Sequence, residues 1–368
     1  MHLHRFAFVI PIAALVLSAC SQGAGPTTTP PVTTAVQPQQ MQSNSQREVS
    51  QSPVNGSYRH GLVPMLNHAI RQPSSTTNLE FQGGISGVGV TTGSPKVYLV
   101  FWGTQWGTQS TNGQGYATFS GDTQGMAPDL QAFFKGLGTG GEMWSGVMTQ
   151  YCQGVKRTAQ FCPSTAAHVG YPTGGALAGV WEDTSAASPA QSTGHQLAVE
   201  AEAAAKHFGN TTQASNRNVQ YDIISPTGTN PDDYQGNGFC AWHDYTGDST
   251  LDGGGGASGP LVAFTNMPYV TDVGANCGAG FTDGKELDGV TIVNGHEWAE
   301  TITDQFPAGG WIDPGGEETG DLCAWISSGT GRARDITLTT GTFAVQTTWS
   351  NLANTRTGGC VIGHKTVT

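Results

Sequence analysis

The segment from Asn294 to Asp304 holds the side chains best suited to metal chemistry. If the segment is helical, His296 and Glu300 project from one face about one turn apart, so both can reach a single cation. Glu297 is rotated around the helix, where it can contact a metal-bound water without binding the metal. The pattern is that of H-E-x-x-H zinc sites, with a glutamate at the second histidine position.

A zinc site that hydrolyses a bond keeps three protein ligands and leaves one position for water. Glu318 follows the predicted helix after a turn-rich bend, so a second element can return and face His296 and Glu300. We predict Glu318 as the third ligand, with Asp321 accepting the other ring N–H of His296. The roles of Glu318 and Asp321 can be exchanged, and the sequence leaves both arrangements open. The simpler interpretation is an ordinary exposed pair on a helix.

His243 is a second catalytic candidate. It lies within the run Phe239–Tyr245, beside Cys240 and ahead of the predicted site helix. A metallopeptidase needs a group that stabilises the tetrahedral intermediate, and His243 could serve as that donor or contact the substrate. A purely structural histidine is the alternative.

Several β-rich runs and helical patterns must position these residues. Glycine accounts for 53 of the 368 residues, so the chain is not mainly helical. Strands are predicted at 95–103, 219–225, 239–245 and 260–265, and helices at 127–135, 142–151 and 197–208. Residues 290–293 could equally end a strand. We predict a single disulfide-bonded α/β (α+β) domain, in which a mixed sheet packs on the site helix as in zincin peptidases.

The charge balance excludes one class of function. The chain has 15 Lys and Arg residues against 27 Asp and Glu residues, for a net charge of −12. It has no basic stripe that could neutralise phosphates, so we predict no nucleic-acid partner. We expect a monomer that acts on a protein or peptide substrate.

The N-terminus predicts export. His2 and Arg5 precede an apolar run, and Leu17–Cys20 resembles a lipobox. Residues 1–20 are therefore predicted to be a lipoprotein signal peptide, with the mature chain attached to a membrane through lipid on Cys20. In a Gram-negative cell this would be the outer membrane. An ordinary secretory signal, which would release the protein outside the cell, is the alternative.

The region after the signal predicts a tether and then a folded domain. Residues 21–83 are rich in Thr, Pro, Gln and Ser and lack hydrophobic periodicity, which is typical of a disordered segment. Within this region, the apolar patch at 62–66 could dock on the domain as a first ordered segment. Residues 84–368 are predicted to form the metallopeptidase-like globular domain.

The cysteines predict disulfides. The chain has seven, and with Cys20 set aside the others form an even set in an oxidising compartment. No C-x-x-C pair supports thiolate zinc ligation. We predict that neighbouring cysteines pair, as Cys152–Cys162, Cys240–Cys277 and Cys323–Cys360.

Five motifs resemble a known family. They are Ser94–Gly103, Gly295–Asp304, Trp311–Asp313, Glu318–Cys323 and Val345–Asn351. Their order over residues 85–365 resembles that in the phosphate-induced protein 1 family, known as EXORDIUM-like proteins in plants, and in its bacterial secreted relatives. The H-E-x-A-E and E-x-x-D-L-C motifs carry most of the specificity. The chain departs from the family pattern at Trp298 and Gln305, where leucine and proline are usual.

The resemblance implies that His296, Glu297, Glu300, Glu318 and Asp321 occupy the polar positions of the family. From the residues we expect an exported, lipid-anchored zinc metallopeptidase-like protein, in which one zinc ion activates water and Glu297 acts as general base. The plant members resemble growth regulators of the cell wall. The alternative is therefore a non-catalytic EXORDIUM-like cell-surface binding protein with a structural metal ion.

Overall fold

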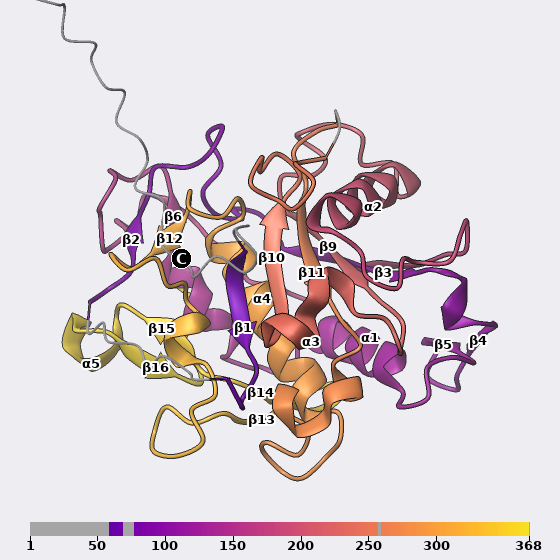
Figure 1. The fold of residues 1–368 in the computed structure, drawn as a ribbon. Coiled ribbons are helices and arrows are strands. Elements are labelled where there is room, and N and C mark those ends of the chain that lie inside the picture. The colour runs from indigo at the N-terminus through magenta and orange to yellow at the C-terminus, as the bar shows by residue number, and fades with distance from the viewer. Residues whose placement is uncertain (1–58, 69–76, 257–258, 368) are drawn as a thin grey trace, which may run out of the picture. The chain divides into compact units, whose positions relative to one another are not determined.

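A six-stranded mixed sheet forms the centre of the computed structural model, which describes residues 59–68, 77–256 and 259–367 (Figure 1). The strand order is β1-β10-β11-β9-β3-β8. Strands β11, β9, β3 and β8 pair in parallel, whereas β10 runs antiparallel to both β1 and β11. The strands are β1 (His60–Pro64), β3 (Lys96–Trp102), β8 (Leu177–Asp183), β9 (Val219–Ile224), β10 (Phe239–Tyr245) and β11 (Ala263–Met267). The predicted mixed α/β architecture is confirmed.

Helix α4 (Asp288–Thr303) packs against β1, β10 and β11 and lies behind β1 and β10 in Figure 1. All of its residues are buried, including the polar ones. Gly295 permits this burial, because a Cβ there would already lie 3.3 Å from the rings of Phe133 and Trp144. No face of α4 meets water, so its polar side chains must find partners inside the protein.

The remaining helices surround this core. Helix α2 (Gly194–His207) packs against β9 and β11, and α1 (Met126–Gly136) packs against α4. Thr193 caps α2, since its hydroxyl accepts the N–H of Gln196 while the Gln196 side chain accepts the N–H of Thr193. The short helices are α3 (Tyr234–Asn237), α5 (Ala353–Arg356) and the 3₁₀ segments Thr104–Trp106, Ser145–Gln150, Pro231–Asp233, Val270–Cys277 and Asp321–Cys323.

Five two-stranded sheets complete the fold of the described residues. Strand β14 packs against α4, and β15 follows it along the chain (Figure 1). The pairs are β2 (Glu80–Phe81) with β12 (Trp311–Ile312), β4 (Gln109–Thr111) with β5 (Ala117–Phe119), β6 (Cys152–Gln153) with β7 (Ala167–His168), β13 (Arg334–Leu338) with β14 (Gly341–Val345), and β15 (Thr348–Ser350) with β16 (Gly359–Val361).

Local patterns predict most of these elements. The predicted strands at 95–103, 219–225, 239–245 and 260–265 correspond to β3, β9, β10 and β11, although β11 begins and ends later than predicted. The helices at 127–135 and 197–208 correspond to α1 and α2, while the one at 142–151 is a 3₁₀ segment. The strand alternative for residues 290–293 is wrong, because they lie within α4.

The folded part begins earlier than the predicted residue 84. Strand β1 is an edge strand of the large sheet, so the apolar patch at 62–66 does dock on the domain. Strand β2 pairs with β12 and also precedes residue 84. The predicted signal peptide, with Cys20, and most of the predicted tether lie outside the described residues. In the part of the chain that is described, no helix has the length and apolar character needed to cross a bilayer.

The three predicted disulfides are confirmed as Cys152–Cys162, Cys240–Cys277 and Cys323–Cys360. The second bond ties β10 to the 3₁₀ segment that precedes α4. The third ties the Asp321–Cys323 turn to β16. Two of the three bonds therefore fix segments that carry predicted site residues.

Asp222 lies within β9 and is fully buried. Burial raises its pKa to about 7, although Asn294 and Thr265 oppose the rise. A carboxyl with a raised folded pKa stabilises the fold while protonated, and this contribution is lost as pH rises from about 4 to about 7.

We therefore expect the unfolding free energy of the wild type to fall by on the order of 4 kcal/mol between about pH 4 and about pH 8 because of Asp222. Asp222→Asn should not show this fall. Urea unfolding of wild type and variant at both pH values measures this difference. Glu286→Gln, at an exposed position, is the control and should leave the pH dependence unchanged. The same pH dependence in Asp222→Asn as in wild type would contradict a buried carboxyl that titrates near neutral pH.

Candidate metal centre

All six predicted site residues come together in the structure. Helix α4 carries His296, Glu297 and Glu300, and β10 contributes His243. The turn after β12 contributes Glu318 and Asp321. The side chains are buried, with Asp321 the most exposed at 9 %. All but Glu297 form two adjacent groups that share Glu300 and could each hold a metal ion.

The first group contains His296, Glu300 and Asp321. The Nε2 atom of His296 lies 3.1 Å from Glu300 Oε1 and 3.4 Å from Asp321 Oδ1. On the other side of the ring, Nδ1 lies 3.0 Å from Oε1 of Gln346. Asp321 therefore faces the same ring nitrogen as Glu300, and Gln346 takes the position at Nδ1 that was predicted for Asp321.

The Gln346 amide determines which ring nitrogen of His296 carries the proton. Its Nε2 donates to the carbonyl oxygens of Gly320 (2.7 Å) and Thr347 (3.3 Å), so its Oε1 must be the acceptor at His296. Nδ1 of His296 is then the N–H donor, and in a neutral ring Nε2 presents a lone pair. A lone pair that faces two carboxylate oxygens requires a cation or a second proton between them.

The second group contains His243, Glu300 and Glu318. The Nε2 atom of His243 lies 3.3 Å from Glu318 Oε2 and 3.6 Å from Glu300 Oε2, while Nδ1 lies 3.3 Å from Thr301 Oγ1. Glu300 is common to both groups and directs a different oxygen to each histidine. Among the described residues, no group with ligand atoms within 4.8 Å of one another contains both histidines.

These distances match the spacing of metal ligands. Ligand atoms about 2.0–2.1 Å from a tetrahedral zinc ion lie about 3.4 Å from one another. Several buried atoms of the site also have no hydrogen-bond partner in the described part of the chain, which is rare for native polar groups. They are Nε2 of His243 and His296, Oε2 of Glu300 and Glu318, and both carboxyl oxygens of Glu297. The donor set thus fits a divalent cation.

Glu300 is fixed at the centre of the site. Its Oε1 accepts the backbone N–H groups of Gly320 (2.9 Å) and Asp321 (2.8 Å), which joins α4 to the following turn. A Cβ at Gly320 would lie 2.8 Å from Glu300 Oε1, so only glycine allows this approach. Burial opposes the charge of Glu300, but His296 and His243 outweigh burial and lower its pKa to about 2.

The other titratable groups respond to the same environment. Burial raises the pKa of Glu297 and Glu318 well above the usual value, although the nearby histidines oppose the rise. Burial disfavours charge on His296 and His243, but the carboxylates outweigh burial and raise both pKa values. Without a metal ion, the buried rings would therefore be imidazolium ions paired with carboxylates.

Strand β1 lies directly against the shared carboxylate. A Cβ at Gly61 would overlap Glu300 Oε2 and the imidazole of His243, so the backbone of β1 closes one side of the site. Gly61 has a φ of 53°, in the left-handed region that favours glycine. Sequence reasoning did not identify Gly61, Gln346 or Thr301 as site residues. It assigned His243 as an oxyanion donor or substrate contact, whereas its ring nitrogen has the surroundings of a metal ligand.

Comparisons of the chain with family models, curated proteins and solved structures found no match. The resemblance to EXORDIUM-like proteins stays a prediction. A functional proposal for this protein therefore rests on the geometry of the site.

We expect Gln346→Met to weaken zinc binding by about 10–100-fold, because the partner that holds the N–H of His296 on Nδ1 is lost. Competition with a chromogenic chelator measures the dissociation constant. Gln150→Met is the matched control, since Gln150 is also a buried, hydrogen-bonded amide but contacts neither group. Equal zinc affinity in Gln346→Met and Gln150→Met would contradict the role of Gln346.

Proposed function

We propose that the protein is a zinc-dependent metallopeptidase with a zincin-like site, in which Glu297 is the general base. The observation that carries this proposal concerns the Nε2 atom of His296. It faces carboxylate oxygens of Glu300 and Asp321, next to a buried glutamate that has no hydrogen-bond partner among the described residues. This combination suits a cation and a proton acceptor side by side.

The chemistry of the donors favours zinc over other ions. Calcium and magnesium prefer oxygen ligands, whereas an imidazole nitrogen with two carboxylates, as each group offers, suits zinc. Thiolates do not compete, because the six cysteines of the described chain all form disulfides. The ligands we propose for the ion beside Glu297 are His296, Glu300 and Asp321, and His243, Glu300 and Glu318 form the adjacent group.

The residues of the chain would divide the work of peptide hydrolysis. The zinc ion would lower the pKa of a bound water and polarise the substrate carbonyl. Glu297 would accept the proton of the attacking water and pass it to the amine nitrogen that leaves. The apolar surroundings that raise the pKa of Glu297 make its carboxylate a stronger base than an exposed glutamate.

One observation favours the alternative, a non-catalytic EXORDIUM-like surface protein with a structural ion. His296, Glu297 and Glu300 have 0 % exposure, so a substrate cannot reach them in this structure, in which β1 covers the Glu300 carboxylate. The enzyme therefore requires β1 to leave the site, whereas the binding protein does not. In either case we propose an exported, monomeric protein anchored through lipid on Cys20, which the three disulfides support because they suit an oxidising compartment.

We expect Glu297→Gln to retain zinc and to lose about 10²–10⁴-fold of the rate of casein hydrolysis, because the proton acceptor is removed while the ligands stay. The test is made in a Gly61→Ala background, which displaces β1 from the site. Glu202→Gln on α2 is the control and should keep full activity. Zinc content is measured in parallel. Bound zinc without any chelator-sensitive hydrolysis in Gly61→Ala would contradict the enzyme and favour the binding protein.

A further inference from the structure

Strand β1 pairs only with β10 in the large sheet, and it occupies the edge next to the site. It can leave without breaking any other strand pair of that sheet. Its departure would expose the edge of β10 beside His243 and uncover the Glu300 carboxylate. An exposed antiparallel edge beside a catalytic centre is a binding site for an extended peptide.

Strand β1 pairs with the edge of β10 in an irregular antiparallel register, with a shift on each side of Val63 and a left-handed backbone at Gly61. Its residues alternate between half-buried and buried positions, with Gly61 and Val63 facing inward. Beyond the strand, the Met65 N–H donates to the carbonyl of Gly238 at 2.8 Å, and the Trp325 indole N–H donates to the carbonyl of Pro64 at 2.6 Å. Main-chain hydrogen bonds and alternate side-chain contacts together hold the strand.

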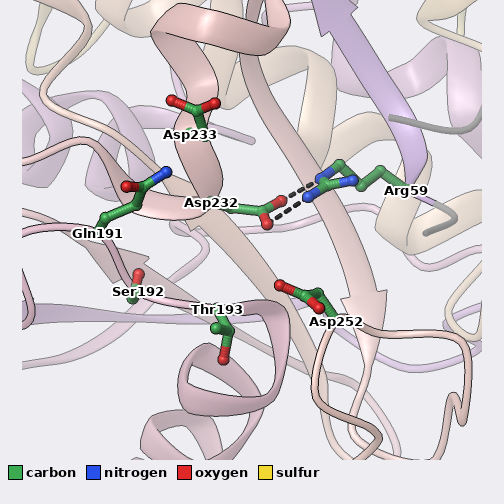
Figure 2. Close-up of a pocket in the computed structure, with 7 residues that line it drawn as sticks. All are labelled: Arg59, Gln191, Ser192, Thr193, Asp232, Asp233 and Asp252. Atoms are coloured by element: carbon green, nitrogen blue, oxygen red, sulfur yellow. Dashed lines mark hydrogen bonds and ion pairs between the residues drawn. The ribbon is translucent and has the colours of Figure 1, made fainter. Parts of the chain in front are cut away.

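The residue before β1 adds a charge contact. Arg59 forms a buried ion pair with Asp232 at one end of a polar cavity of about 220 Å³ (Figure 2). Asp233 and Asp252 also line this cavity, so its lining holds three carboxylates and one guanidinium. If Arg59 left, the buried Asp232 would lack its counter-charge, which is costly unless another cation enters. The cavity therefore selects a basic side chain.

We propose that the edge of β10 is a peptide-binding groove, and that β1 is its intramolecular occupant. The ligand is an extended peptide with a basic residue in the acidic cavity and, two residues later, a glycine over Glu300 and His243. This proposal rests on the proposed function, since it names the substrate class of the same site. The intact protein is then latent, and displacement of β1 admits the substrate.

The first test uses a fluorescein-labelled peptide with the sequence of residues 59–66. Gly61→Ala removes the fit of β1 against the site, so the peptide should bind this variant about tenfold or more tightly than wild type. Fluorescence anisotropy measures both affinities. Gly87→Ala is the matched control, because Gly87 also has a positive φ but no atom lies near its Cβ position. Equal peptide affinity in wild type, Gly61→Ala and Gly87→Ala would overturn the proposal.

A second form of the protein guards against misfolding of Gly61→Ala. A recognition sequence for a site-specific protease, inserted between residues 72 and 73, allows β1 to be cut from the folded chain. The cut protein should bind the labelled peptide, and a peptide with alanine in place of Arg59 should bind it at least about tenfold more weakly. No binding to the cut protein, or equal binding of both peptides, would overturn the groove or its basic preference.

The readouts separate this inference from the proposed function. Peptide binding by Gly61→Ala and by the cut protein, without casein hydrolysis in either, supports the groove and contradicts the enzyme. Equal casein hydrolysis by wild type and Gly61→Ala, with no competition from the 59–66 peptide, supports the enzyme and contradicts the groove. Hydrolysis that rises on displacement of β1 and falls on addition of the peptide supports both.

Discussion

The position of one proton on His296 governs the candidate site. The Gln346 amide is held by two backbone carbonyls, so it can only accept at Nδ1, and in a neutral ring the other nitrogen faces Glu300 and Asp321 with its lone pair. Nitrogen lone pairs and carboxylate oxygens repel one another in a buried place. A cation or a second proton between them removes the repulsion, and the acidic groups that converge on the two histidines could hold a metal ion.

The fold places this polar centre where water cannot compensate it. Helix α4 is buried along its whole length, so Glu297 and Glu300 cannot reach solvent. The mixed sheet brings His243 to the helix, and the following turn places Glu318 beside His243 and Asp321 beside His296. The disulfide at Cys240 fixes β10 close to His243, and the disulfide at Cys323 fixes the turn close to Asp321. Preorganisation of this kind is what a metal site requires.

The parts of the site that depend on one helix could be predicted from the sequence. The spacing of His296, Glu297 and Glu300 follows from helical periodicity, and the short return to Glu318 and Asp321 keeps them close in space. The assignment of each carboxylate to a histidine could not be predicted, because it depends on how the turn packs against α4. Asp321 joins His296 and Glu318 joins His243 for this reason.

Long-range pairing hides the other contributors. Gln346 belongs to a motif that resembles the family, but an amide is not a typical zinc ligand and its contact with His296 spans fifty residues of sequence. Strand β1 comes from a region with the composition of a tether, and only its pairing with β10 makes it part of the sheet. The apolar patch at 62–66 indicates an ordered segment, but no local pattern shows that it pairs with β10 beside the site.

Anomalous diffraction at the zinc absorption edge, from crystals of the purified protein, tests the central claim most directly. The account predicts a peak about 2 Å from Nε2 of His296, with Glu300 and Asp321 among the ligands. A map without a peak, in which His296 donates a hydrogen bond from Nε2 to Glu300, would show a protonated ring in a buried ion pair and contradict the metal site.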